Sequence, residues 1–110
     1  MIDWDALREN FSNRNAFIIR ILNKALTGIG DAREKLSRAA EQKNMEDIAF
    51  SAHGTKGIAG NMMAKALFDK AVDTEVKARK NNPDVYEDVD ELLSLMDCFI
   101  SEVKAELKVK

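Results

Sequence analysis

Apolar residues recur along most of this chain at alternating spacings of three and four, the period at which one face of an α-helix repeats. The longest such series consists of Ile18, Leu22, Ala25, Ile29, Ala32, Leu36 and Ala39. Gly28 and Gly30 could form a turn within it. We predict one continuous helix over residues 14–42, because Ile29 keeps the same phase on both sides, although the glycines leave open whether it is kinked.

A short helix is predicted before it, over residues 3–10, with Asp3 as its N-cap and Trp4 covering one end of the core. Ser12 or Asn13 is expected to cap the long helix. The polar residues that follow that helix end with Asn44, which we expect to cap the next one.

The third helix is predicted over residues 45–62, with a turn or a bend near Asn61. The apolar face of the fourth comprises Leu67, Phe68, Ala71, Val72 and Ala78. The segment Asn81-Asn82-Pro83-Asp84 separates it from the fifth, because proline suits the first turn of a helix and acidic residues are favourable near its N-terminus. The fifth helix has the longest apolar face: Val85, Val89, Leu92, Met96, Phe99, Val103 and Leu107.

Four long amphipathic helices with short connections predict an all-α fold, an antiparallel four-helix bundle with the short N-terminal helix packed across one end. The 110 residues are enough for a single domain, 1–110, with one core. A net charge of −2 without long runs of one sign gives no indication of nucleic-acid or membrane binding. With no signal peptide and no long apolar run, the protein is expected to be cytoplasmic and a monomer.

Cys98 is the only cysteine, which rules out an intramolecular disulfide and a cysteine-based zinc site. Its spacing to Leu95 and Phe99 favours a core or near-core thiol over a nucleophile.

The third helix also carries the only histidine of the chain, His53, and three of its five glycines. Its predicted buried face consists of Met45, Ile48, Ala52, Thr55, Ala59 and Met62. At about 100° per residue, His53 lies roughly 130° from the centre of that face and should point outward. The outward strip that it occupies also contains Glu46, Ala49, Phe50, Gly57 and Gly60.

Glycines inside a helix have a cost, about 0.8–1.0 kcal/mol each relative to alanine. Three of them around His53 indicate that a partner approaches the backbone closely, with Lys56 placed to neutralise an anion held at the imidazole. The sequence around His53 contains neither the further ligands of a metal site nor the paired groups of an acid-base site. Use of the imidazole as a nucleophile fits best.

Glu75 interrupts the apolar face of the fourth helix. A carboxylate in such a position is either an edge residue that reaches water or a group retained for a specific contact. Periodicity alone does not decide between them. Two interpretations of Phe50 are also left: it is either part of an exposed docking surface or tucked against the next helix.

The stretch Ala52-His53-Gly54-Thr55-Lys56-Gly57-Ile58-Ala59-Gly60-Asn61 resembles the AHxxKGxxG signature of histidine-containing phosphotransfer (HPt) domains. It departs from many members at Met63, where they have a further glycine. The resemblance implies that His53 is the phosphorylated nucleophile, that Lys56 neutralises the phosphoryl charge, and that Glu75, 22 residues after the histidine, orients the imidazole. The implied docking surface comprises Glu46, Ala49, Phe50, Gly54, Gly57 and Gly60.

The implied function is that of a phosphorelay intermediate in two-component signal transduction. Its partners would be receiver domains of response regulators or hybrid histidine kinases, and it would need no cofactor, because the magnesium belongs to the receiver. The chain has no glycine-rich nucleotide loop, so we expect no kinase activity of its own. Two alternatives are a module of the same fold that binds receivers without transferring phosphate, and an unrelated helical adaptor with a chance motif.

Overall fold

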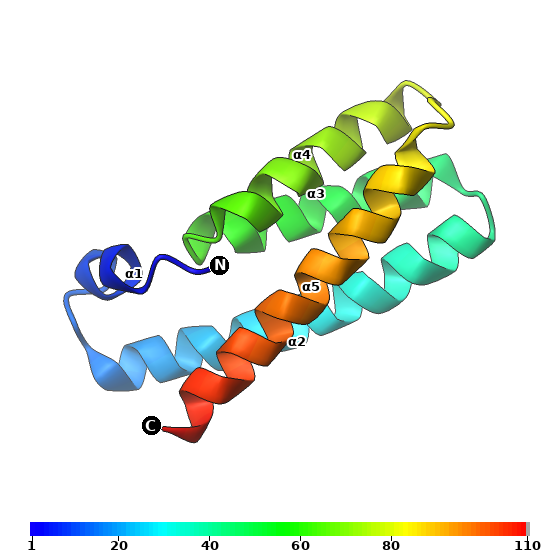
Figure 1. The fold of residues 1–110 in the computed structure, drawn as a ribbon. Coiled ribbons are helices and arrows are strands. Elements are labelled where there is room, and N and C mark those ends of the chain that lie inside the picture. The colour runs from blue at the N-terminus through cyan, green and yellow to red at the C-terminus, as the bar shows by residue number, and fades with distance from the viewer. Residues whose placement is uncertain (110) are drawn as a thin grey trace.

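The helices pack side by side as an up-and-down bundle in the computed structural model, which describes residues 1–109 (Figure 1). Those residues form the helices α1 (Trp4–Asn10), α2 (Asn15–Glu41), α3 (Met45–Asn61), α4 (Lys65–Arg79) and α5 (Val85–Lys108). Each long helix contacts two others, in the pairs α2 with α3, α3 with α4, α4 with α5, and α5 with α2. The predicted all-α four-helix bundle is therefore confirmed.

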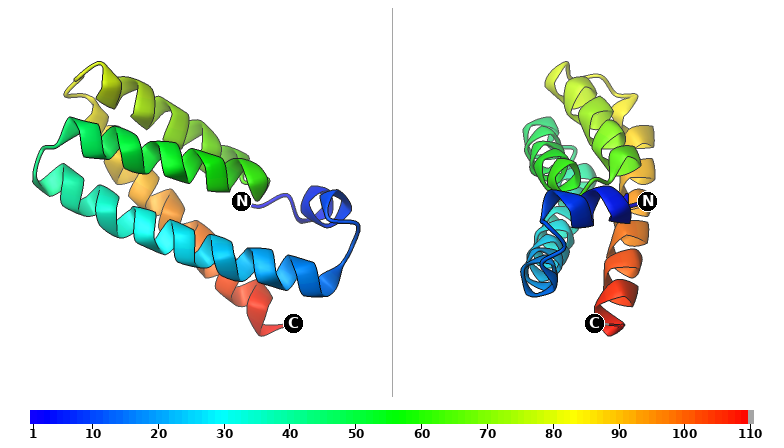
Figure 2. Two further views of the ribbon diagram at one scale, coloured as in Figure 1. Left: turned by 180° about the vertical axis from the view of Figure 1, so that it is seen from behind. Right: turned by 90° about the vertical axis from the view of Figure 1, so that its left-hand side faces the viewer.

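The short helix α1 lies at the end of the bundle where α2 begins and α5 ends (Figure 2). Its Leu7 is fully buried, and Trp4 is half-buried against the core, as predicted. The backbone N–H of Asp3 donates to the carbonyl oxygen of Met63 over 3.0 Å, which ties the start of α1 to the turn between α3 and α4.

Helix α2 runs without interruption through both of its glycines, as the phase of Ile29 predicted. A Cβ atom on Gly28 would lie 2.7 Å from Cδ1 of Ile58, so this glycine lets α2 and α3 approach closely. No such contact exists at Gly30.

The predicted caps are confirmed at two helices and wrong at a third. Side-chain oxygens of Asp3 and Asn44 each accept a backbone N–H of their own helix over 3.1 Å. Helix α2 instead begins after Arg14, which makes no side-chain capping bond. Ser12 and Asn13 do not cap it because they have φ values of 54° and 55° and form the left-handed end of α1.

The first four helices all end in the same way, with a residue of positive φ that is not glycine. These residues are Ser12, Lys43, Met63 and Asn81. In each case the next N–H bonds a carbonyl five residues back, for example Ala64 to Ala59 over 3.0 Å, which is the hydrogen bond of a Schellman motif. Glycine is the usual residue there, but in this chain no glycine has a positive φ, because all five lie within helices.

Cys98 corrects one prediction, because it is exposed and not part of the core. The buried face of α5 passes through Met96, Phe99 and Val103. Cys98 lies about 100° around the helix from Phe99, outside that face.

Left-handed backbone at a residue with a side chain is strained, so replacing that residue with glycine should raise the free energy of unfolding. For Lys43→Gly, whose side chain is exposed, we expect a gain of up to about 1 kcal/mol in urea unfolding. For Met63→Gly the gain should be smaller, since Met63 also packs against the core. Lys35→Gly, inside α2, is the control and should lose about 1 kcal/mol. A loss at Lys43 would show that the turn is not strained.

Candidate functional site

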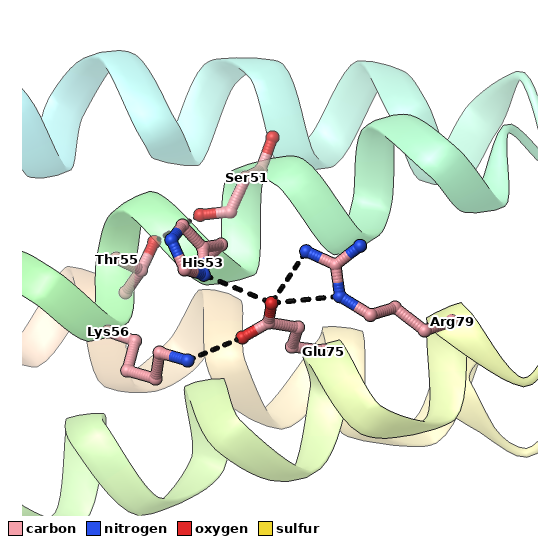
Figure 3. A network of polar contacts seen from close by, with 6 residues as sticks. All are labelled: Ser51, His53, Thr55, Lys56, Glu75 and Arg79. Atoms are coloured by element: carbon pink, nitrogen blue, oxygen red, sulfur yellow. Dashed lines mark hydrogen bonds and ion pairs between the residues drawn. The ribbon is translucent and has the colours of Figure 1, made fainter.

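His53 lies on the side of α3 that faces solvent, next to α4, with its side chain 60% exposed (Figure 3). The outward orientation expected from periodicity is therefore present.

Thr55 lies on the buried face of α3. Its hydroxyl group donates a hydrogen bond to the carbonyl oxygen of Ser51 over 2.8 Å, so this buried polar group is satisfied within the helix.

Glu75 reaches His53 from α4. Its Oε2 lies 3.0 Å from Nδ1 of His53, and its Oε1 accepts a hydrogen bond from Nζ of Lys56 over 2.8 Å. Its side chain is only 10% exposed, so the alternative that it is an edge residue reaching water is wrong. The structure thus brings together the three residues expected to carry the chemistry.

Arg79 is a fourth member of this group that the sequence reasoning did not identify. Its Nε and Nη2 both donate to Oε2 of Glu75, over 2.9 and 2.7 Å. The signal was present, because residues four apart on a helix are neighbours and Arg79 follows Glu75 by four.

The ionisation of Glu75 fixes the tautomer of His53. Burial alone would raise the pKa of Glu75, but hydrogen bonds from Lys56, Arg79 and His53 outweigh it and lower the pKa from 4.5 to about 2. At neutral pH the carboxylate is therefore charged and can only accept, so Nδ1 must carry the proton. The lone pair is left on Nε2, which makes no hydrogen bond within residues 1–109.

Most residues of the predicted docking surface are exposed to solvent. Glu46, Gly54, Gly57 and Gly60 are exposed, and Phe50 is 72% exposed, so it is not tucked against another helix. Ala49 is only 3% exposed, and its assignment to this surface was wrong. Both α2 and α4 pack on α3, so the buried arc is wider than the apolar stripe and includes Ala49.

The glycines beside His53 have no intramolecular packing role that would explain them. A Cβ atom on Gly54 or Gly57 would meet no atom within 4 Å other than its chain neighbours and the backbone of its own helix. On Gly60 it would only touch the ring of Phe68 at an ordinary 3.5 Å. Val76, which follows Glu75 on α4, is a further exposed apolar residue. Its exposed fraction is 45%, and the sequence reasoning did not identify it.

The described chain, residues 1–109, contains no group of three or more His, Cys, Asp and Glu side chains placed to hold a metal ion. Likewise, none of the helices in that range is long and apolar enough to cross a membrane.

The lowered pKa of Glu75 predicts a dependence of stability on pH. A folded-state pKa near 2 against an unfolded value near 4.5 stabilises the fold above about pH 4.5, and this contribution is lost as pH falls towards 2. It amounts to at most about 3 kcal/mol. The stability difference between wild type and Glu75→Gln should therefore shrink between pH 5 and pH 2 in urea unfolding. The control, Glu46→Gln at an exposed site, should show a much smaller change, and a constant difference for Glu75→Gln would contradict the prediction.

Comparisons with known proteins bear on the fold. No protein-family model matches this chain, and no sequence among the curated proteins is similar enough to count as a relative. Two solved structures match it over almost its whole length. The HPT domain of an Hpt sensor hybrid histidine kinase from Shewanella has a TM-score of 0.88 and 17% identity, covering 99% of this chain and 95% of that one.

The second structure is histidine-containing phosphotransfer protein B (HptB) from Pseudomonas aeruginosa PAO1. It has a TM-score of 0.87 and 16% identity, covering 99% of this chain and 96% of that one. Identities this low establish a shared architecture and leave the activity to be argued from the site. The chain therefore has the fold of histidine-containing phosphotransfer domains.

Proposed function

We propose that this protein is a phosphorelay intermediate, which accepts a phosphoryl group on His53 from a phosphorylated receiver aspartate and passes it to another receiver. The observation that carries the proposal is the exposed imidazole whose Nδ1 lies 3.0 Å from a buried, charged carboxylate. The HPt-like fold and the glycines with no intramolecular contact support it.

The transfer step follows from the tautomer. The lone pair of Nε2 attacks the phosphorus of the aspartyl phosphate, the P–O bond to the aspartate breaks, and the carboxylate leaves with the bonding electrons. The ring becomes positively charged, and Glu75 stabilises that charge through the Nδ1–H bond. Attack by a second receiver aspartate reverses these events and restores neutral His53.

Lys56 supplies positive charge one helical turn from His53. A phosphoryl group on Nε2 would bring a charge of about −1.5 to −2 to a partly exposed position, where a single ammonium ion offsets part of it. The receiver would hold the magnesium needed for transfer, and the bare backbone at Gly54 and Gly57 would let its loops approach the imidazole. The setting we propose for this exchange is the cytoplasm.

A binding module without transfer remains the alternative, because the exposed Phe50 and Val76 would serve docking in either case. What favours transfer is the group of Lys56, Glu75 and Arg79 around His53, since binding alone requires no oriented nucleophile.

We expect His53→Gln to fold normally and to accept no phosphate from a phosphorylated receiver. Glutamine keeps polarity and comparable bulk at an exposed site but has no ring nitrogen for the phosphoryl group. Mass spectrometry near neutral pH should locate the phosphate of the wild type on His53, with the acid lability and alkali stability of a phosphoramidate. Phosphate on the His53→Gln protein, or none on wild type with any receiver of the same organism, would leave only the binding module.

We expect Gly57→Leu to weaken receiver binding at least 10-fold, because it adds bulk beside the imidazole. The control is Gly30→Leu, at a glycine that is equally free of contacts but lies on α2. Both variants should gain up to about 1 kcal/mol in thermal unfolding, since leucine favours helix more than glycine does. Isothermal titration with a receiver measures the affinity, and equal affinities for the two variants would show that Gly57 does not face the partner.

A further inference from the structure

Arg79 is bound to Glu75 by two hydrogen bonds, and the carboxylate that accepts them is buried. Both N–H groups that it uses point to Oε2, the same oxygen that lies near Nδ1 of His53. Lys56 alone donates to Oε1. The buried carboxylate of Glu75 therefore has one cation on each of its oxygens (Figure 3).

Counting charges shows what Arg79 adds. The negative charge of Glu75 is matched by the positive charge of Lys56, so these two residues alone would present no net charge to an incoming phosphoryl group. With Arg79 the group carries one excess positive charge beside a neutral imidazole. An anion with a charge of about −1.5 to −2 is then attracted to the site, where otherwise it would meet no net attraction.

The geometry allows Arg79 to replace Lys56 as the hydrogen-bond donor to Oε1 of Glu75. Oε2 faces three N–H groups although an oxygen has two lone pairs, so Arg79 and His53 share it. The fork of a guanidinium fits both oxygens of a carboxylate, and Lys56 occupies the second one. If the flexible Lys56 turns towards a phosphoryl group on Nε2, Oε1 becomes free and Arg79 can bind both oxygens.

We propose that Arg79 is a positioning residue of this site, which neutralises Glu75 and thereby leaves the charge of Lys56 available to the phosphoryl group on His53. This inference rests on the proposed phosphotransfer function. Arg79 touches neither the imidazole nor the phosphoryl group in this role and acts through Glu75.

The test uses phosphoramidate, a small donor that needs no docking surface. The Nε2 lone pair of His53 attacks its phosphorus, the P–N bond breaks, and ammonia leaves after taking up a proton from water. The rate of phosphorylation and the half-life of the phosphohistidine are measured by mass spectrometry. The full chain is used in the variants Arg79→Gln, Glu75→Gln, Arg79→Lys and the double variant Glu75→Gln with Arg79→Gln.

Charge balance predicts the order of the variants. Arg79→Gln removes the excess positive charge and should slow phosphorylation and shorten the half-life on the order of 3- to 10-fold. The double variant has the same net charge as the wild type, and the amide oxygen introduced by Glu75→Gln can still accept from Nδ1. It should therefore be phosphorylated faster than Arg79→Gln, but more slowly than the wild type because the Glu75 carboxylate is lost. Arg79→Lys keeps the charge and should recover most of the loss. The defect of Arg79→Gln should shrink in 1 M salt.

Lys80→Gln is the matched control, because it removes the same charge from the next residue, which is exposed and outside the group. It should behave as wild type. An unchanged Arg79→Gln protein, or a double variant no faster than Arg79→Gln, would overturn the role of Arg79 while the wild type still accepts phosphate. Failure of the wild type itself, with both phosphoramidate and receivers, would overturn the proposed function and this inference with it.

Discussion

The structure of the site depends on one buried carboxylate. Glu75 lies where the apolar face of α4 meets α3, and a charge at such a position is unfavourable unless cations and hydrogen bonds surround it. Lys56 and Arg79 satisfy this requirement, and the same contacts place Oε2 against Nδ1 of His53. The contacts that stabilise the carboxylate are thus the same ones that orient the imidazole, so a change in one affects the other.

The distribution of glycine follows a related logic. Helix ends with positive φ, where glycine would relieve strain, are occupied by serine, lysine, methionine and asparagine. The glycines lie within α2 and α3, where each lowers local helix stability. Gly28 is explained by the close approach of Ile58, whereas Gly54 and Gly57 face open space. The chain therefore gives up stability in two different ways, and no packing contact within the protein accounts for the pair beside His53.

Much of the fold could be predicted from the sequence, because an apolar period runs along each of the four long helices, interrupted only by Thr55 in α3 and Glu75 in α4. It located all five helices and the continuity of α2 through its glycines. The Ser12 and Asn13 caps failed because both residues adopt left-handed backbone at the end of α1, which the capping pattern does not indicate. Ala49 and Cys98 were misplaced because a stripe gives the centre of a buried face but not its width, which depends on the neighbouring helices.

The site was less accessible to sequence reasoning. The pairing of His53 with Glu75 came from the family resemblance, and the structure supplied the contact, the burial and the tautomer. Arg79 was visible in principle as the residue four after Glu75, but a surface arginine on a helix is common and its fork points inward only because the carboxylate is there. Val76 was overlooked because it lies outside the apolar stripe of α4, and the predicted docking surface included only residues of α3.

All four polar residues of the site come from the antiparallel pair α3 and α4, so the turn at residues 62–64 sets their register. One residue added within α4 between its start and Glu75 would move Glu75 by about 100° around that helix and carry its carboxylate away from His53. The polar site is therefore contained in one helical hairpin, which α2 and α5 support by packing against α3 and α4.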